Sequence, residues 1–296
     1  MTGLGEGERY VSISADGSTL ATLNLEGTVR IWDVPTGGEP AHTHSGLTAD
    51  PMSMLVSADG AHVAVTDLAG MLYLLSDGGT ETVEAHTGSA YLAHFSPADD
   101  LVATHGEDME IRMWDPETGA EEVTLTGHTG PVRDTSFSGD GTLLASSAGD
   151  GTARWWDLDE PGEIGMAEFE GEGPYAVAAS SDDRLVGVVD EPEGSPVLET
   201  GSGETIAELD SLDGFSSLRF CTDDRTMVSV SMASGRLWDS HLGDTVGTLI
   251  GGADGVPGTD SADGLMPALN RDCTLFVWID GEPGDGSVVA NSVVPA

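Results

Sequence analysis

Lysine is absent from this chain of 296 residues, and all ten of its basic residues are arginines. This absence excludes P-loop nucleotide hydrolases, Schiff-base enzymes and protein kinases, because each of these classes needs a lysine amine. The ten arginines stand against 52 acidic residues, which gives a net charge of −42. A chain of this charge cannot present the broad basic face that a nucleic-acid backbone requires.

Long apolar runs and cysteines are also scarce. No stretch approaches the roughly eighteen apolar residues of a membrane span. Met1 to Tyr10 lacks the basic region and the apolar run of a signal peptide, so we expect a soluble cytoplasmic protein. The only cysteines, Cys221 and Cys273, give neither a zinc spacing nor a disulfide framework.

An acidic turn recurs along the whole chain. It reads SADG at Ser14 to Gly17, and its acidic position recurs seven times with spacings of 40 to 43 residues. A tryptophan recurs in phase with this turn in five of the seven copies, and Leu75 and Glu199 stand at the tryptophan position in the other two. The aligned acidic residues are at 16, 59, 99, 140, 182, 223 and 263, and the tryptophans are Trp32, Trp114, Trp156, Trp238 and Trp278.

Each repeat of about 41 residues predicts four short antiparallel strands. Asp-Gly turns between short β-rich runs are strong hairpin signals, and no segment shows a sustained helical period. Seven such units predict an all-β, seven-bladed β-propeller of four-stranded antiparallel blades, formed by residues 1–296 as one domain. The expected blades span residues 9–44, 45–86, 87–128, 129–171, 172–213, 214–254 and 255–296.

These repeats resemble the WD-repeat family over essentially the whole chain. Gly127-His128 matches the family's glycine–histidine pair, and Ala85-His86 and Thr43-His44 are degraded copies of it. The family's tryptophan–aspartate signature is matched by TVRIWD at Thr28 to Asp33, EIRMWD at Glu110 to Asp115, TARWWD at Thr152 to Asp157 and GRLWD at Gly235 to Asp239.

The resemblance implies a hydrogen-bonded brace of His, Ser or Thr, Asp and Trp inside a blade. Such a set is structural, because the imidazole lies between a carboxylate and a hydroxyl and the indole N–H is satisfied as well. The expected members are His128, Ser146, Asp150 and Trp156 in blade four, and His86, Thr104, Asp108 and Trp114 in blade three.

Blades two, five and seven depart from the family pattern, and we expect packing to hold them. Ring closure is also unusual, because only Met1 to Glu8 precede blade one. Ser287 to Val294 can itself form the outer strand of blade seven, so we expect closure by face packing without strand exchange, or with at most a weak N-terminal addition. Cys221 and Cys273 fall in turns at opposite ends of a blade, so we expect both to be unpaired.

No catalytic or metal-binding motif stands out. The chain has no G-x-S-x-G elbow, and neither cysteine has a neighbouring histidine. His42 and His44 would share one face of a strand, but a zinc site needs further converging ligands and His44 already fits the brace position. The acidic turn at Asp280 to Asp285 does not match the EF-hand spacing. We therefore expect no cofactor and no metal.

The acidity has three possible sources. A negative surface can capture a basic partner or mimic DNA, and an acid-rich surface without lysine is also typical of adaptation to high salt. The acidic residues are spread over all seven repeats, which favours salt adaptation over a dedicated docking face. A general acidic bias of the host's proteins is the weakest of the three explanations.

One set of aligned residues indicates a binding site for a protein partner. The position five residues before the end of each first strand should line the mouth of the central channel. Arginine, tyrosine and, less sharply, methionine are enriched at protein interfaces, although each could also simply pack on its neighbour. The residues at this position are Arg9, Met52, Tyr91, Arg133, Tyr175, Ser216 and Val256.

The sequence thus favours a non-enzymatic protein–protein interaction scaffold, a monomeric propeller that binds a protein partner at the channel mouth or in blade grooves. Two alternatives stay open. One is a propeller enzyme, a hydrolase or lyase, with its site in the channel, which converging His, Asp and Glu side chains would favour. The other is a sensor module of a larger regulatory protein. Fold alone does not decide between these functions.

Overall fold

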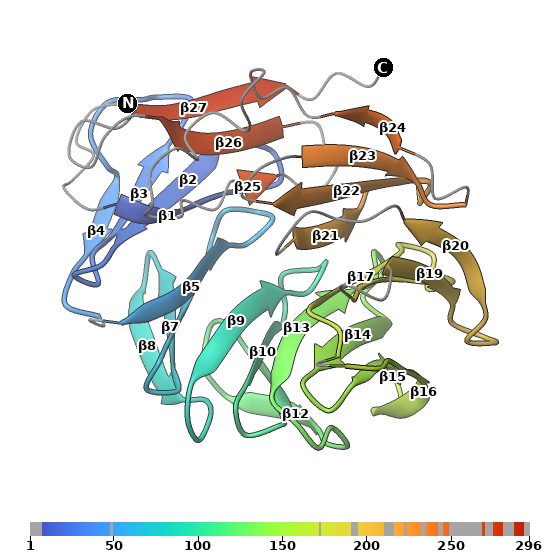
Figure 1. Cartoon of the computed structure of the whole chain (residues 1–296). Helices are drawn as coiled ribbons and strands as arrows, with labels where there is room; N and C mark the ends of the chain where they lie inside the picture. Colours follow the sequence, from blue (N-terminus) through green and yellow to red (C-terminus); the bar gives the residue numbers. More distant parts are fainter. Residues whose placement is uncertain are drawn as a thin grey trace.

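The computed structural model describes residues 8–47, 50–171, 173–190, 195–209, 216–221, 224–231, 235–241, 245–248, 268–269, 275–280 and 287–292. These residues form six four-stranded antiparallel sheets and one three-stranded sheet, and they contain no helix. Figure 1 shows the sheets arranged around a centre, each starting with its innermost strand. The all-β architecture of four-stranded antiparallel blades is therefore confirmed.

The first strand of each blade lies innermost. Successive first strands contact one another in the order β1, β5, β9, β13, β17 and β21. β1 also contacts β25 and β26 of the last sheet, so that sheet meets the first blade. The six inner strands are β1 (Glu8–Ile13), β5 (Pro51–Val56), β9 (Ala90–Phe95), β13 (Val132–Phe137), β17 (Ala176–Ala179) and β21 (Ser216–Phe220).

The second strands are the most completely buried. Every residue of β10, β14 and β18 is buried, because both faces of these strands are covered by neighbouring blades. The second strands are β2 (Thr19–Asn24), β6 (Val63–Asp67), β10 (Val102–Gly106), β14 (Leu143–Ala148), β18 (Leu185–Val189) and β22 (Thr226–Ser231).

The third strands carry the recurring tryptophans, and the fourth strands form the outer edge. The exposed pattern of β8 shows the contrast with the interior strands. The third strands are β3 (Val29–Asp33), β7 (Met71–Ser76), β11 (Ile111–Trp114), β15 (Thr152–Asp157), β19 (Ser195–Glu199) and β23 (Gly235–Asp239); the outer strands are β4 (His42–His44), β8 (Gly79–Glu84), β12 (Glu121–Leu125), β16 (Gly162–Glu168), β20 (Thr205–Leu209) and β24 (Thr245–Thr248).

The last sheet contains β25 (Ala268–Leu269), β26 (Leu275–Asp280) and β27 (Ser287–Ser292). β27 pairs with β26 at the edge of the sheet, as expected for an outer strand. Within the described residues β1 pairs only with β2, so first and last sheets meet by packing. Much of the seventh repeat lies outside the described residues, so the number of blades and their boundaries stay predictions.

The core is divided among the blade-to-blade contacts. One apolar cluster joins Ala103 and Met113 of blade three to Leu144 and Trp156 of blade four. Comparable clusters join blades one and two, two and three, four and five, and five and six. Blades two to five therefore each bury both faces against their neighbours, which is how a propeller is stabilised without a single central core.

Polar side chains accept hydrogen bonds from backbone N–H groups at the free edges of the inner strands. An inner strand has no further strand on its central side, so its outward N–H groups need other acceptors. Ser12 of blade one accepts the N–H of Val56 in blade two at 3.0 Å. Asp134 of blade four accepts the N–H of Val177 in blade five, also at 3.0 Å. Each such bond fixes one blade against the next.

The acidic turns are built on a serine and an aspartate. Ser138 Oγ donates to Asp140 Oδ1 at 3.0 Å and accepts the N–H of Leu143 at 3.0 Å. The same arrangement occurs at Ser14, Ser57 and Ser180. The recurring aspartate therefore closes a tight turn through local hydrogen bonds, which explains its regular spacing.

The aspartates Asp99, Asp183 and Asp224 connect turns of consecutive blades. The sequence aligned Asp99 with Asp16, but Asp100 accepts the Ser96 hydroxyl and Asp99 takes the next position of the turn instead. The three connecting aspartates have φ of 58°, 60° and 54°, at a turn position that glycine occupies in blades one, two and four. Asp99 accepts the N–H groups of Ala58 and Asp59 in the preceding blade at 2.9 and 2.8 Å. Asp183 accepts the hydroxyl of Thr142, and Asp224 accepts both the N–H and the hydroxyl of Ser181. We call these three residues the interblade aspartates.

The described residues include no helix of a length and apolarity that would allow it to cross a membrane.

The expectation of two unpaired cysteines is wrong for Cys221, which is disulfide-bonded. The chain's other cysteine, Cys273, lies outside the described residues. The expectation relied on turn positions in idealised blades, and those positions do not determine the distance between two turns in different blades.

Candidate functional site

A continuous hydrogen-bonded series runs through the interior of blade four. Trp156 Nε1 donates to Ser146 Oγ at 2.9 Å, and Ser146 Oγ lies 2.8 Å from His128 Nε2. His128 Nδ1 lies 3.0 Å from Asp150 Oδ2. A carboxylate only accepts, so Nδ1 carries the imidazole proton and Nε2 accepts the serine hydroxyl. Each of the four side chains thus has a hydrogen-bond partner within the series, as expected for a structural brace.

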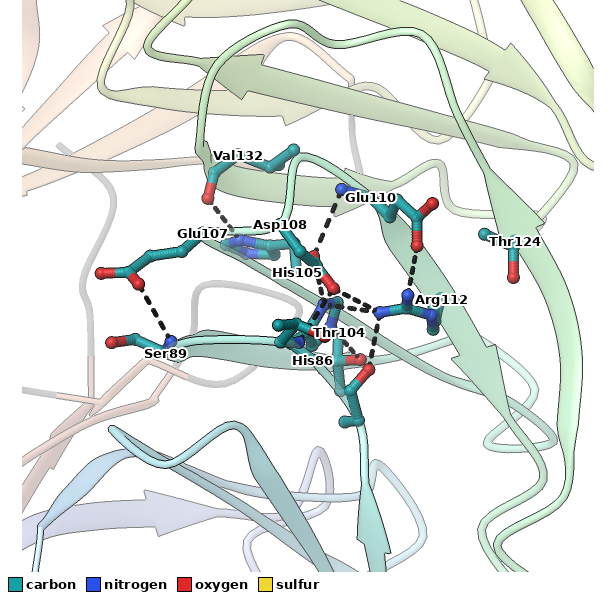
Figure 2. Close-up of polar contacts among 12 residues, drawn as sticks. His86, Ser89, Thr104, His105, Glu107, Asp108, Glu110, Arg112, Thr124 and Val132 are labelled. Carbon is teal, nitrogen blue, oxygen red and sulfur yellow. Dashed lines mark hydrogen bonds and ion pairs between the residues drawn. The ribbon is translucent and has the colours of Figure 1, made fainter.

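Blade three contains the same series, of which Figure 2 labels Thr104, His86 and Asp108. Trp114 Nε1 donates to Thr104 Oγ1 at 2.8 Å, and this hydroxyl lies 2.8 Å from His86 Nε2. His86 Nδ1 lies 2.8 Å from Asp108 Oδ1. Arg112 donates to Asp108 Oδ2 at 2.8 Å (Figure 2). Arg112 also donates to the carbonyl of Ala85 at 2.7 Å.

The electrostatics of both braces favour neutral histidine and ionised aspartate. Burial lowers the pKa of His86 and of His128, and the hydrogen bonds that these histidines donate to Asp108 and Asp150 oppose the shift. Burial acts to raise the pKa of Asp150, but hydrogen bonds from Thr129, Thr152 and His128 outweigh it and lower this pKa to about 2. Neither histidine is placed to exchange protons near neutral pH, which suits a structural role.

Blades two and five replace this network by apolar packing. Leu75 lies at the tryptophan position of blade two and is fully buried. In blade five the expectation that Glu199 holds this position is wrong by one residue. Leu198 pairs with Val186 as Trp156 pairs with Leu144, and Leu198 is buried while Glu199 is half-buried. Leu198 follows Val186 at the same spacing as Trp156 follows Leu144, so counting from the second strand gives Leu198 and not Glu199.

His44 does not take part in a brace. Its Nδ1 lies 3.2 Å from Thr80 Oγ1, on the outer strand of the next blade. His42 Nε2 lies 3.2 Å from Asp77 Oδ1. The two histidines thus contact separate partners at the outer edge, and among the described residues no third metal-binding side chain converges on them.

The predicted mouth residues lie at one end of the ring, here called the entrance face. It comprises the beginnings of the inner strands and the turns that follow the second strands. These parts are adjacent, because the N–H of Leu68 donates to the carbonyl of Asp50 and that of Gly149 to the carbonyl of Pro131. The acidic turns lie at the other ends of the inner strands.

Arg133 and Tyr175 form a stacked pair on the entrance face. The Arg133 guanidinium carbon lies 4.7 Å from the centroid of the Tyr175 ring. Arg133 Nη1 also donates to the carbonyl of Gly173 at 3.0 Å. Both side chains are half-buried. The guanidinium is therefore held in one orientation across blades four and five, and its other N–H groups are not used by these contacts.

Tyr91 of blade three lies beside this pair. Burial, followed by the charge and hydrogen bond of Glu107, raises the pKa of the Tyr91 hydroxyl, while the charge of Arg133 opposes the shift. Arg9 and Met52, in blades one and two, are half-buried at the same end. No described contact joins these two residues to the other three. The structure thus groups Tyr91, Arg133 and Tyr175 and leaves Arg9 and Met52 separate, while the Ser216 side chain and Val256 lie outside the described residues.

A second cluster, not expected from the sequence, lies between blades three and four. It joins His94 of β9, His105 of β10 and Asp134 of β13, whose candidate ligand atoms all lie within 4.8 Å of one another. His105 is fully buried, and His94 and Asp134 are half-buried. Burial lowers the pKa of His94 to about 4 and of His105 to about 3, and it raises the pKa of Asp134 to about 7. Its only sequence signal is His105, a histidine within a strand that both periodicity and neighbours predict to be buried.

Antiparallel four-stranded sheets arranged in a ring define the chain as a β-propeller protein. A family model described as "WD domain, G-beta repeat" matches residues 119–157. Pre-mRNA-processing factor 19 of Oryza sativa subsp. japonica is 26% identical over 231 residues, which cover 71% of the chain and 42% of that protein. Coronin-7 of Mus musculus is 29% identical over 55% of the chain and 18% of its own length. Nuclear distribution protein PAC1 of Arthroderma benhamiae is 30% identical over 48% of the chain and 33% of its own length.

Residues 119–157 match a WD repeat, and the similarities to these relatives support a place for the chain among WD-repeat proteins. The in-phase tryptophan–aspartate signatures, the braces of blades three and four and the similarity to these relatives agree on this point. The chain spans about two fifths of the length of the first relatives it matches. The similarity to WD-repeat proteins supports a general role as a protein-interaction scaffold.

Proposed function

We propose that this protein is a non-enzymatic scaffold that binds a protein partner on its entrance face, around Tyr91, Arg133 and Tyr175. The observation that carries the proposal is the stacked Arg133–Tyr175 pair, with the guanidinium bonded to the carbonyl of Gly173. A side chain held in this way loses less conformational entropy when a partner binds than a free arginine does.

The chemistry of the three residues fits a binding site. Tyrosine supplies a large contact area with few rotatable bonds, and arginine supplies a planar fork for carboxylate or carbonyl oxygens. With ten arginines in a chain of net charge −42, Arg133 is a rare positive point on an acidic molecule. The partner segment is therefore expected to present carboxylate or backbone carbonyl oxygens to Arg133.

Exposed apolar side chains extend the same face. Leu25 is 49% exposed, Leu68 50% and Met109 41%, and all three lie in turns that follow a second strand. These turns belong to blades one, two and three, and the arc of Tyr91, Arg133 and Tyr175 continues the face from blade three to blade five. Apolar residues beside an oriented arginine and two tyrosines combine the residue types that dominate interface energetics.

The proposal has further parts that rest on composition. A chain without lysine and with few arginines is not suited to bind nucleic acid, so the proposed partner is a protein. The proposed state is a monomeric propeller in the cytoplasm whose partner binding needs no cofactor, and the dispersed acidity serves solubility at high salt more than docking.

The test first identifies a partner by a pull-down at high salt from the native host, with identification by mass spectrometry. The affinity of that purified partner is then measured for Arg133→Ala and for Tyr91→Ala combined with Tyr175→Ala. A hot-spot side chain contributes about 2 kcal/mol or more, so each variant should bind roughly thirtyfold more weakly than the parent.

Arg184→Ala is the matched control. Arg184 is exposed in the acidic turn of blade five, at the end of the ring opposite the entrance face. This variant removes the same charge from the other face and should bind as the parent does. Equal affinity of the entrance-face variants and the control, with unchanged melting temperatures, would place the partner elsewhere and refute the proposal.

One observation favours a second candidate function, an enzyme with its site inside the ring. Two histidines and an aspartate converge there, in His94, His105 and Asp134. Converging imidazole and carboxylate groups can perform acid–base or metal-assisted chemistry, as in a hydrolase or lyase. The two candidates are separable, because this cluster and the Arg133–Tyr175 pair use different side chains.

A further inference from the structure

We propose that His94, His105 and Asp134 form a binding site for a divalent transition metal ion, with Zn²⁺ as the best-fitting ion, between blades three and four. This site is independent of the proposed partner-binding face. It also differs from the two braces, because none of its three residues belongs to a His–Ser/Thr–Asp–Trp series.

The donor set fits this class of ion. Two imidazole nitrogens and one carboxylate oxygen are typical of zinc and of related first-row metals, whereas calcium and magnesium prefer oxygen ligands alone. The three candidate ligand atoms come from three strands, β9, β10 and β13, and lie within 4.8 Å of one another. Ligands of one tetrahedral zinc lie about 3.4 Å apart, so binding requires only small side-chain movements.

The hydrogen bond of His105 prepares it to act as a ligand. His105 Nδ1 lies 3.0 Å from the backbone carbonyl of Val132, a contact that Figure 2 shows. A carbonyl only accepts, so Nδ1 carries the proton and Nε2 presents its lone pair. Metal-binding histidines commonly donate their second ring nitrogen to a backbone carbonyl in this way, which fixes the tautomer and the ring orientation.

The Nε2 atom of His105 supplies an independent sign of a ligand. His105 is fully buried, and this nitrogen is buried without a hydrogen-bond partner among the described residues. Buried polar atoms in folded proteins almost always have a partner, so an unpartnered nitrogen within a cluster of metal-binding side chains needs an explanation. A metal ion bonded to Nε2 provides one.

The other two residues are also held in place and keep capacity to bind. His94 Nδ1 lies 3.0 Å from the hydroxyl of Thr135, so its ring is oriented. Asp134 accepts the N–H of Thr135 at 2.9 Å and that of Val177 at 3.0 Å, one on each oxygen. A carboxylate oxygen has more than one acceptor direction, so each of these oxygens can also coordinate a cation.

The site is accessible from the centre of the ring. His94 and Asp134 are half-buried and lie on inner strands, so an ion can enter from that side. Arg219 of β21 places a positive charge near both residues and opposes a cation. Its side chain is exposed, so solvent and salt screen this repulsion. Three protein ligands leave a further coordination position for water or for a group of a bound molecule.

The test measures Zn²⁺ binding to the full chain by titration calorimetry after chelator treatment, with an excess of Mg²⁺ present to occupy surface carboxylates. We expect a single saturating equivalent of Zn²⁺ and an increase in melting temperature. Co²⁺ in place of Zn²⁺ should give the visible absorption of a coordinated ion. His94→Gln, His105→Gln and Asp134→Asn should each weaken binding by about 100-fold or more and abolish the Co²⁺ spectrum.

His42→Gln is the matched control, because His42 is an exposed histidine at the outer edge of blade one. It should bind Zn²⁺ as the parent does. His105 and Asp134 are tied into the fold, so His94→Gln decides the question if the other two variants do not fold. Absence of saturable Zn²⁺ binding, which would leave a hydrated polar pocket only, overturns the proposal. So does binding that survives His94→Gln and disappears in His42→Gln.

Discussion

Blades three and four differ from blades two and five in how their interiors are held together. Blades three and four use a buried hydrogen-bonded series of tryptophan, hydroxyl, histidine and aspartate. Blades two and five have Leu75 and Leu198 at the tryptophan position. Val65 and Val188 occupy the position of the hydroxyl, two residues along the second strand, and both are buried.

The difference shows that a blade interior can be stabilised either by the complete polar network or by apolar packing alone. A buried hydroxyl without its partners costs roughly 1–3 kcal/mol, so the members of a network are best exchanged together. In blades two and five both the tryptophan and the hydroxyl have been replaced by apolar residues. In blade six Trp238 Nε1 donates to Ser229 Oγ at 2.8 Å, so this blade shares the contact between tryptophan and hydroxyl with blades three and four.

The largest expected effect is that of salt on stability, and it tests whether the two kinds of blade are equally sensitive to charge repulsion. The net charge of −42 repels itself over about 30 Å at 0.01 M salt and over about 3 Å at 1 M. We expect the melting temperature to rise steeply between these conditions. At low salt, hydrogen exchange should detect local opening of blades two and five before that of blades three and four. A melting temperature that does not change with salt would contradict salt adaptation.

The second prediction concerns removal of the tryptophan, the largest side chain of the network in blade four. Trp156→Leu removes most of a fully buried ring and leaves Ser146 Oγ without the indole donor. We expect a loss of about 3 kcal/mol in the free energy of unfolding, measured by urea denaturation. Adding Ser146→Val and His128→Leu should cost less than the sum of the single losses, because the triple variant approaches the apolar type. Strict additivity would show that the members do not act as a unit.

The third prediction removes the central member alone. His128→Ala leaves Ser146 Oγ and Asp150 Oδ2 without their imidazole partner, at roughly 1–3 kcal/mol for each orphaned group. Thermal and urea unfolding should both show the loss, and partner affinity should stay unchanged. A variant with parental stability that lost a binding activity would mean that His128 has a functional role instead.

The fourth and smallest effect concerns pH. The pKa of Asp150 is about 2 in the folded protein against an ordinary value of 3.8, so its contribution is complete above about pH 4 and is lost as the pH falls toward 2. The lowered pKa of His128 acts in the same direction, because its contribution is present above pH 6.5 and is lost as the pH falls through the lowered value. Hydrogen exchange of β14 and β15 should therefore accelerate in acid. In Asp150→Asn the part of this change below pH 4 should be absent.

The sequence predicted the propeller architecture because its signals are local and repeat in phase. The Ser–Asp turn and the tryptophan recur at a fixed spacing, and each has a local structural cause, seen at Ser138 with Asp140 and at Trp156. Blade five was misaligned by one residue, although Leu198 stands at the same spacing from Val186 as Trp156 does from Leu144. The arc of Tyr91, Arg133 and Tyr175 was found by aligning the repeats, but alignment could not show that Arg133 stacks on Tyr175.

The cluster of His94, His105 and Asp134 could not be found in the same way. The three residues lie on different strands of two blades and hold no common position in the repeat. Their convergence depends on which side chains cross the contact between blades. The disulfide of Cys221 was missed for a related reason, because a contact between distant segments leaves no local pattern.

The interblade aspartates, Asp99, Asp183 and Asp224, affect how the charge of this chain can be altered by engineering. Each adds to the negative charge, adopts a backbone conformation that glycine would enter more easily, and bonds the preceding blade. A glycine there relieves the backbone but loses the bond. A redesign that lowers the acidity for use in ordinary buffers should therefore begin with exposed glutamates of outer strands, such as Glu81 and Glu84, and leave these three aspartates unchanged.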